Sequence, residues 1–216
     1  MITQTAKVHA QAWKQVFDAF LQKTTKPFGP FDPVTDYDLY VDGKPREDGV
    51  RDFLAARHIE VPEVTIHELA DEKDRLFLEL IHNHGVETYE GTIRYIRAAR
   101  ATGRKLAVVS SSRHTTEVLR AAKLQKLFDA QVDGIVAERE HLKGKPAPDT
   151  YLRAAEMLRT TAKQSAVYED ALAGVEAGRA GGFALVVGVD RAGQREALYG
   201  HGADVVVNDL AELLTS

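Results

Sequence analysis

The chain of 216 residues is long enough to bury a hydrophobic core, and its 44% hydrophobic and 28% charged residues are ordinary for a globular protein. Its formal net charge of −4 argues against binding to nucleic acid or to an acidic membrane. The absence of cysteine excludes disulfides, thiolate metal sites and cysteine nucleophiles. The longest apolar stretch, residues 183–189, is too short to span a membrane, and the N-terminus has no signal-peptide pattern. We therefore expect a cytoplasmic protein.

Residues 1–85 predict a small helical domain. Apolar residues between Val8 and Leu21 fall on one side of a helix that extends from about residue 5 to 22. Helical character also marks residues 49–59 and 66–82. The segment 26–45 is rich in proline, glycine and aspartate, which is typical of a loop.

Residues 86–216 predict an α/β domain in which short strands alternate with helices. The segments 148–159 and 171–182 have helical character. The expected strands are the β-branched runs 105–110, 131–136, 165–170, 183–189 and 203–207. Their alternation with helices indicates right-handed βαβ units and a parallel sheet.

Polar residues follow three of these strands, at the edge where parallel sheets bind ligands. Ser110 and Ser112 follow the first strand, Lys145 lies between a glycine and a proline after the second, and Glu169 and Asp170 end the third. Adjacent carboxylates repel each other, so we expect a cation beside them or a role in capping the next helix. Together the set suits a phosphoryl group held by Ser110 and Lys145, with Mg²⁺ held by Glu169 and Asp170.

Simpler structural roles stay open for the same residues. Ser110 can be an ordinary residue at a strand end and Ser112 a helix N-cap. Lys145 can be a solvated loop lysine, as most lysines are. The aspartates Asp133 and Asp190 lie in or after expected strands but belong to no wider pattern.

Three segments resemble the second, third and fourth motifs of the haloacid dehalogenase (HAD) superfamily. They are SSSRH at 110–114, KGKPAPDTY at 143–151 and YEDALAGVEAG at 168–178, and their order, spacing and position after strands all fit. The first part of the chain resembles the helical cap of the β-phosphoglucomutase subgroup, on residues 3–13 (TQTAKVHAQAW) and 41–54 (VDGKPREDGVRDFL). The resemblance implies a Rossmann-like parallel-sheet core, residues 86–216, with an entry segment and cap at 1–85.

The same resemblance implies phosphoryl transfer through an aspartyl-phosphate with Mg²⁺, interconverting β-glucose 1-phosphate and glucose 6-phosphate. It assigns catalytic roles to Lys145, Ser110 and His9, and the metal to Glu169 and Asp170. The implied partner is a small sugar phosphate, and the full-length family is monomeric. The substrate-binding residues that it implies are Ser110, Ser112, Arg113, His114, Trp13, Arg46 and Lys73. For His9, His114, Arg46 and Lys73 a surface role stays open.

The first family motif, an Asp-x-Asp-Gly that supplies the nucleophile and the acid/base, falls before the segment matched by residues 3–13. Both aspartates and their strand are therefore absent from these residues. A start codon assigned too late, a truncated form or a pseudogene-like product explains this equally. We expect the chain as given to be inactive. We also expect it to be poorly folded, or to self-associate through unpaired strand edges, because the missing strand is central in the family's sheet.

Two rival functions stay open. A phosphatase of the same superfamily uses the same residues and lets water attack. A non-enzymatic remnant binds at most phosphate and Mg²⁺. Arg46 favours the mutase over the phosphatase, because a mutase must hold a second phosphate.

Overall fold

The computed structural model describes residues 1–24 and 29–214, which form two compact units. Unit 1 comprises Met1–Thr3 and Thr88–Ser216, and unit 2 comprises Gln4–Glu87. In the described part of the chain, every helix is too short or too polar to cross a bilayer.

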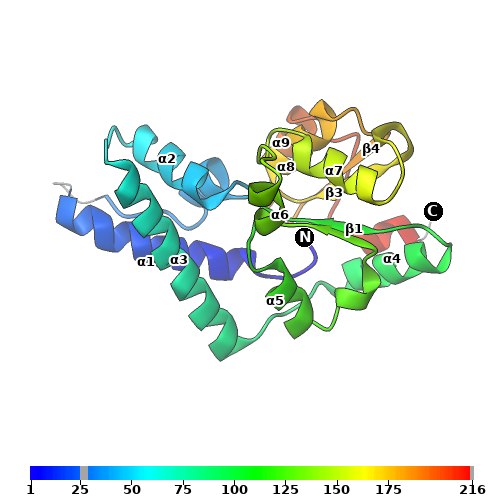
Figure 1. Ribbon diagram of the computed structural model, residues 1–216, viewed down its shortest axis with the longest axis horizontal. Coiled ribbons are helices and arrows are strands. Elements are labelled where there is room, and N and C mark those ends of the chain that lie inside the picture. Colours follow the sequence, from blue (N-terminus) through cyan, green and yellow to red (C-terminus); the bar gives the residue numbers. More distant parts are fainter. Residues whose placement is uncertain (25–28, 215–216) are drawn as a thin grey trace. The chain divides into compact units, whose positions relative to one another are not determined.

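Unit 2 is helical, with α1 (Ala6–Thr24), a π-helical turn η1 (Tyr37–Val41), α2 (Arg46–Ala56) and α3 (Glu63–His84) (Figure 1). On α1, Trp13, Phe17 and Leu21 recur every four residues and are buried on one face. Their side chains share a core with Phe31 and Phe53. The expected helix near residues 5–22 is confirmed, and no strand is found in the described residues of this unit.

The other two helices of unit 2 begin three residues earlier than the apolar pattern predicts. Each begins directly after a proline, Pro45 for α2 and Pro62 for α3. Acidic side chains occupy both first turns, where they interact favourably with the helix dipole. Arg46, which lies between the expected loop 26–45 and the expected helix 49–59, is the first residue of α2. The expected loop 26–45 is interrupted by η1, and its residues 26–28 lie outside the described range.

The described residues of unit 1 contain five strands, all paired in parallel. Strands β1 (Ala107–Val109) and β2 (Ala130–Val132) form one sheet. The other has the order β3-β4-β5 and consists of β3 (Ala166–Glu169), β4 (Leu185–Val189) and β5 (Val205–Val207). The α/β class with parallel pairing is confirmed, but the expected single sheet is divided into two pieces.

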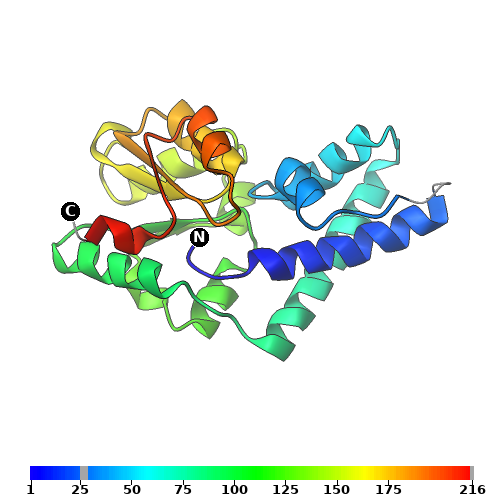
Figure 2. The same cartoon turned by 180° about the vertical axis from the view of Figure 1, so that it is seen from behind.

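Six helices accompany these strands in the part of unit 1 that the structure describes, with short 3₁₀ turns between them. The helices are α4 (Glu90–Ala101), α5 (Thr115–Ala121), α6 (Gly134–Arg139), α7 (Asp149–Met157), α8 (Leu172–Ala180) and α9 (Arg195–Gly200). The turns are η2 (Gln125–Leu127), η3 (Ala162–Gln164) and η4 (Leu210–Leu214). Figure 2 shows η4 beside α4, against which it packs.

The expected strand at 131–136 is only half correct, because the chain turns into α6 at Gly134. Asp133 explains the change. Its buried carboxylate accepts hydrogen bonds from the backbone N–H groups of Ile135 and Val136, which caps the new helix.

The first two residues pack against the apolar clusters of both sheets. Ile2 packs against the cluster that contains Val108 of β1, and Met1 packs against the cluster that contains Val187 of β4. Helix α7 also joins the two sheets, since it packs against β1 and β2 while its Tyr151 shares a cluster with Val167 of β3.

Candidate active site

The end of β3 holds a buried ion pair. The Lys145 Nζ atom lies 2.8 Å from Glu169 Oε2, and the two residues are only 6% and 8% exposed. Lys145 comes from the loop between α6 and α7, and Glu169 is the last residue of β3. The solvated-lysine alternative for Lys145 is therefore excluded, because its ammonium lies at the sheet edge with a fixed partner.

The remaining acceptor positions of Glu169 are also filled. Its Oε2 accepts a 2.6 Å hydrogen bond from the Tyr151 hydroxyl. Its Oε1 accepts from the backbone N–H groups of Asp170 and Ala171 at 3.3 and 3.2 Å. Burial alone raises the pKa of the Glu169 carboxyl, but the Lys145 ammonium and the hydrogen bonds from Lys145 and Tyr151 hold it well below its usual value. Glu169 is therefore ionised at neutral pH.

Asp170 lies beside a different cation. Its Oδ2 is 2.6 Å from the N-terminal ammonium of Met1. Among side chains, Lys145 provides the expected cation beside the acid pair, at Glu169. Helix α8 has Ala171 as its N-cap residue with no side-chain capping bond, so the Asp170 side chain does not cap it.

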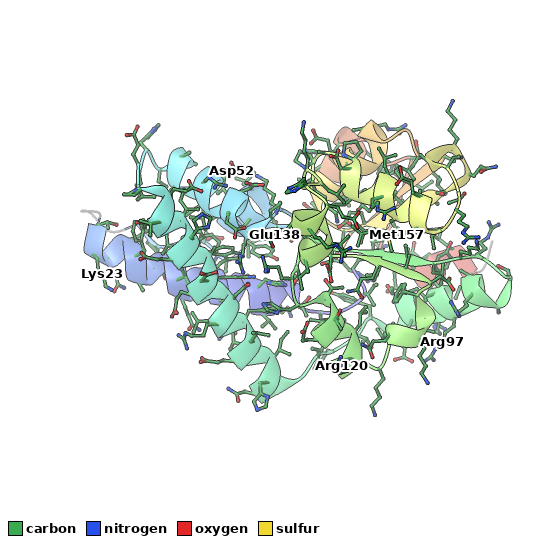
Figure 3. All side chains as sticks on the ribbon, viewed as in Figure 1. Lys23, Asp52, Arg97, Arg120, Glu138 and Met157 are labelled. Atoms are coloured by element: carbon green, nitrogen blue, oxygen red, sulfur yellow. The ribbon has the colours of Figure 1, made fainter. Side chains whose placement is uncertain are left out.

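Ser110 and Ser112 form a tight turn directly after β1. The Ser110 Oγ accepts from the backbone N–H of Ser112 at 3.1 Å, and the Ser112 Oγ accepts from that of His114 at 3.1 Å. His114 is the N-cap residue of α5, so the alternative that Ser112 is the N-cap does not hold. Arg113 points to α6, where it pairs with Glu138, which is labelled in Figure 3.

The candidate residues of unit 2 gather around an aromatic cluster. The His9 ring stacks on Phe77, with 4.0 Å between ring centroids and 8° between planes. The Lys73 ammonium lies 5.4 Å from the Trp13 ring and 4.9 Å from the Phe77 ring. Lys73 is only 6% exposed, so the solvated role does not hold for it. Burial lowers the pKa of its ammonium to about 8, although Asp74 opposes the shift.

Arg46 is surrounded by carboxylates of its own unit. Its Nε lies 2.9 Å from Glu47, its Nη2 lies 3.1 Å from Asp71, and its Nη1 pairs with Asp74. Partial burial lowers the pKa of the guanidinium, and the hydrogen bond with Glu47 and the three acids together raise it above its usual value. A phosphate that binds Arg46 must therefore displace at least one of these carboxylates.

Two residues of the site were missed by the sequence reasoning. Tyr151 ends the quoted KGKPAPDTY segment, but nothing in its spacing reveals that its hydroxyl meets Glu169. Gly174 lies on α8 against the same carboxylate, and a Cβ there would be 2.5 Å from the Glu169 Cδ. The cluster of small residues in α8 is the only sequence signal for this close approach.

The family model for haloacid dehalogenase-like hydrolases matches residues 2–182. A β-phosphoglucomutase from Mycobacterium bovis is 48% identical over 230 residues, covering 99% of this chain and 88% of that protein. The chain belongs to the HAD superfamily, in its β-phosphoglucomutase-like subgroup. By family it is a phosphotransferase or hydrolase enzyme, whose chemistry is phosphoryl transfer or the hydrolysis of a sugar phosphate.

Two further relatives extend the comparison for this HAD protein. A phosphorylated carbohydrates phosphatase from Thermotoga maritima is 29% identical over 196 residues, covering 88% of this chain and 81% of that protein. A crystal structure of β-phosphoglucomutase from Clostridium difficile matches with a TM-score of 0.80 at 22% identity, covering 99% of this chain and 88% of that chain. The last similarity supports the fold alone.

The HAD nucleophile pattern, Asp-x-Asp-Gly, does not occur in the sequence. An Asp-x-Asp without the glycine occurs at Asp36-Tyr37-Asp38, which enters η1 of unit 2 rather than following a strand. Asp133 caps α6, and Asp190 accepts a 2.8 Å hydrogen bond from the backbone N–H of Gln194.

Proposed function

We propose that this HAD protein carries the substrate-binding and charge-neutralising parts of a β-phosphoglucomutase. In that reaction β-glucose 1-phosphate and glucose 6-phosphate interconvert through a bisphosphate. The observation that carries the proposal is Lys145, a buried ammonium fixed by Glu169 at the carboxyl end of β3. The M. bovis relative, at 48% identity, supports the mutase among the reactions of the family.

In unit 1, Lys145 and Ser110 are proposed to hold the transferred phosphoryl group. The ammonium offsets the charge of the phosphoryl oxygens, so that a second anion can approach them. Ser112, Arg113 and His114 follow Ser110 in the turn after β1 and are proposed to border the same group.

The donor set of unit 1 fits Mg²⁺. This ion binds proteins through one or two carboxylates and completes its shell with water and substrate phosphate. The Met1 nitrogen, 2.6 Å from Asp170 Oδ2, supports a cation position at this carboxylate. Asp170 would hold the ion directly, and Glu169 would join it by giving up one of its present hydrogen bonds. When bound, Mg²⁺ neutralises charge on the phosphoryl oxygens.

In unit 2, the proposal gives Arg46 the distal phosphate and gives His9, Trp13 and Lys73 the sugar and its hydroxyls. An arginine fork donates two charge-assisted hydrogen bonds to a phosphate, which a monophosphate-hydrolysing enzyme does not need. The three carboxylates around Arg46 keep its side chain oriented until a phosphate replaces them.

A sugar-phosphate phosphatase is the second candidate, favoured by the similarity to the T. maritima phosphatase. It uses the same Lys145 and Mg²⁺ site and needs no second phosphate. A non-enzymatic remnant that binds phosphate and Mg²⁺ is the third. Residues 1–216 lack Asp-x-Asp-Gly, so we expect this chain alone to have no turnover. An in-frame Asp-x-Asp-Gly before Met1 in the gene favours an enzyme, and a stop codon there favours the remnant.

The test compares the 216-residue chain with a version extended by a strand that ends in Asp-x-Asp-Gly, each with and without Arg46→Ala. We expect the unextended chain to be inactive and the extended chain to isomerise β-glucose 1-phosphate. Arg46→Ala should lower kcat/KM for isomerisation about tenfold to a hundredfold, since a charge-assisted contact is worth about 1.5–3 kcal/mol. Hydrolysis of acetyl phosphate, which has no distal phosphate, should change little.

Equal losses with both substrates would place the phosphatase ahead of the mutase. Turnover by the unextended chain would show that the nucleophile lies within residues 1–216. An extended chain that binds phosphate but turns over no sugar phosphate would favour the remnant.

A further inference from the structure

Tyr151 contacts both members of the buried ion pair. Its hydroxyl donates to Glu169 Oε2 at 2.6 Å, and the same oxygen accepts from Lys145 Nζ at 2.8 Å. Its ring also lies beneath the ammonium, with the Nζ atom 5.0 Å from the ring centroid. The Tyr151 hydroxyl thus binds the Glu169 carboxylate, and the Tyr151 ring faces the Lys145 ammonium.

The ring of Tyr151 is itself fixed. The residue lies in the first turn of α7, is 7% exposed, and packs edge-on against Phe183 with 6.0 Å between ring centroids. A buried phenol needs a polar partner for its hydroxyl, and a partner elsewhere in the core would satisfy that need. Tyr151 instead donates to Glu169 Oε2, the oxygen that also binds Lys145, so its hydroxyl helps to set the position of the ion pair.

Glu169 is held from two sides in this packing. Backbone N–H groups of Asp170 and Ala171 hold its Oε1. On the side of α8, the Cα of Gly174 leaves room for the carboxylate that a side chain would fill, since a Cβ would lie 2.8 Å from Oε2. The carboxylate is therefore held by donors on both oxygens and by the absence of a side chain at Gly174.

We propose that Tyr151 is a positioning residue for Lys145, acting through Glu169. Tyr151 fixes the direction in which the Lys145 ammonium points, and so sets where that ammonium contacts an incoming phosphoryl group. The inference rests on the proposed role of Lys145 in phosphate binding, and Gly174 serves the same positioning from the opposite side.

The test measures how fast an amine-acylating reagent labels Lys145, read by mass spectrometry of the folded 216-residue chain. Lys143, exposed in the same loop, is the internal reference for general loosening of that loop. Tyr151→Phe removes only the hydroxyl and keeps the ring. Because losing a hydrogen bond to a charged group corresponds to a change of about tenfold or more, we expect the Lys145-to-Lys143 labelling ratio to rise about tenfold.

Tyr95→Phe is the matched control, since it removes a partly buried tyrosine hydrogen bond elsewhere in unit 1, the 2.6 Å contact with the Tyr168 hydroxyl. It should leave the ratio unchanged. Gly174→Ala displaces Glu169 without touching Tyr151, and it should raise the ratio as Tyr151→Phe does. A ratio that stays at the wild-type value in both Tyr151→Phe and Gly174→Ala overturns the proposal, as does an equal rise in Tyr95→Phe.

Inorganic phosphate with Mg²⁺ separates this inference from the proposed function. In the wild type, phosphate should slow the labelling of Lys145 but not of Lys143, and Tyr151→Phe should need about tenfold more phosphate for the same protection, since one hydrogen bond to the charged pair is lost. If phosphate protects the wild type and the variant equally, the positioning role fails while the site stands. If phosphate protects neither, the proposed phosphate site fails, and the ratio without phosphate still decides whether Tyr151 fixes Lys145.

Discussion

Lys73 shows what burial does to a single charged side chain in unit 2. Its ammonium lies between the Trp13 and Phe77 rings and 3.5 Å from Asp74 Oδ1. The rings and the carboxylate favour the charged form, yet burial outweighs them and lowers the pKa from 10.5 to about 8. The charged lysine is therefore kept at a cost in stability.

The pH dependence of stability follows from that shift. Between about pH 8 and 10.5 the unfolded chain binds a proton at Lys73 that the folded chain does not, so the free energy of unfolding rises with pH in this window. Lys73→Met abolishes this dependence. The stability of the Met variant relative to the wild type should therefore fall by on the order of 3 kcal/mol as the pH rises from 8 to 10.5. Urea unfolding of both proteins at several pH values measures it, and a constant difference would contradict it.

At the scale of one element, the short helix α6 depends on its N-terminal cap. The buried Asp133 carboxylate accepts from the N–H groups of Ile135 and Val136 at 3.1 and 2.9 Å, and from the Gln131 side chain at 2.7 Å. The helix has only six residues, Gly134–Arg139, and none of them is buried. Short helices are marginal in isolation, so the cap supplies much of what keeps α6 in place.

Replacing this cap should lower global stability measurably. We expect Asp133→Ala to reduce the free energy of unfolding by about 1–2 kcal/mol, because two helix N–H groups and the Gln131 amide lose their acceptor. Asp133→Asn keeps one acceptor oxygen and should lose less than half as much. Thermal and urea unfolding of the three proteins provide the comparison, and equal stability of the Ala variant and wild type would show that water replaces the cap.

At the same scale, the sequence located most elements but not their boundaries. The β-branched runs found all five strands, because buried parallel strands are continuously apolar. The run 131–136 was misjudged because Ile135 and Val136 suit a strand equally well, and the Asp133 cap decides for a helix. Helices α4 and α9 were not predicted, although α4 buries Ile93 and Ile96 on one face.

The site was partly predictable for a related reason. Residue type and position after a strand identified Lys145, Glu169 and Asp170. Their partners follow from packing in three dimensions, which no local pattern records, so the Tyr151 hydroxyl and the carboxylates around Arg46 were not foreseen.

At the scale of the whole molecule, the unpaired strand edges are the main hazard. The two sheets leave the outer edges of β1, β2, β3 and β5 without a partner strand among the described residues. Unpaired edges are templates for pairing with another chain. Val205 on β5 adds an apolar side chain that is 38% exposed.

We expect the 216-residue chain to self-associate as its concentration rises, and sedimentation velocity over a concentration series will show it. Val205→Lys places a charge on the β5 edge and should weaken association through that edge. If association persists in this variant, the edges of β1, β2 or β3 carry it. A monomer at every concentration would contradict the expectation.

The ion pair at the end of β3 also bears on how cooperatively the two sheets of unit 1 open. Lys145 follows the β1–β2 segment of the sequence, whereas Glu169 and Asp170 belong to the three-stranded sheet. Each sheet is contiguous in sequence, so we expect each to open as a separate cooperative segment in native-state hydrogen exchange. A ligand bound by both Lys145 and Asp170 would couple the opening of the two sheets. Ligand binding would then make the two sheets open together, and the two opening events seen in hydrogen exchange would merge into one as the ligand is added.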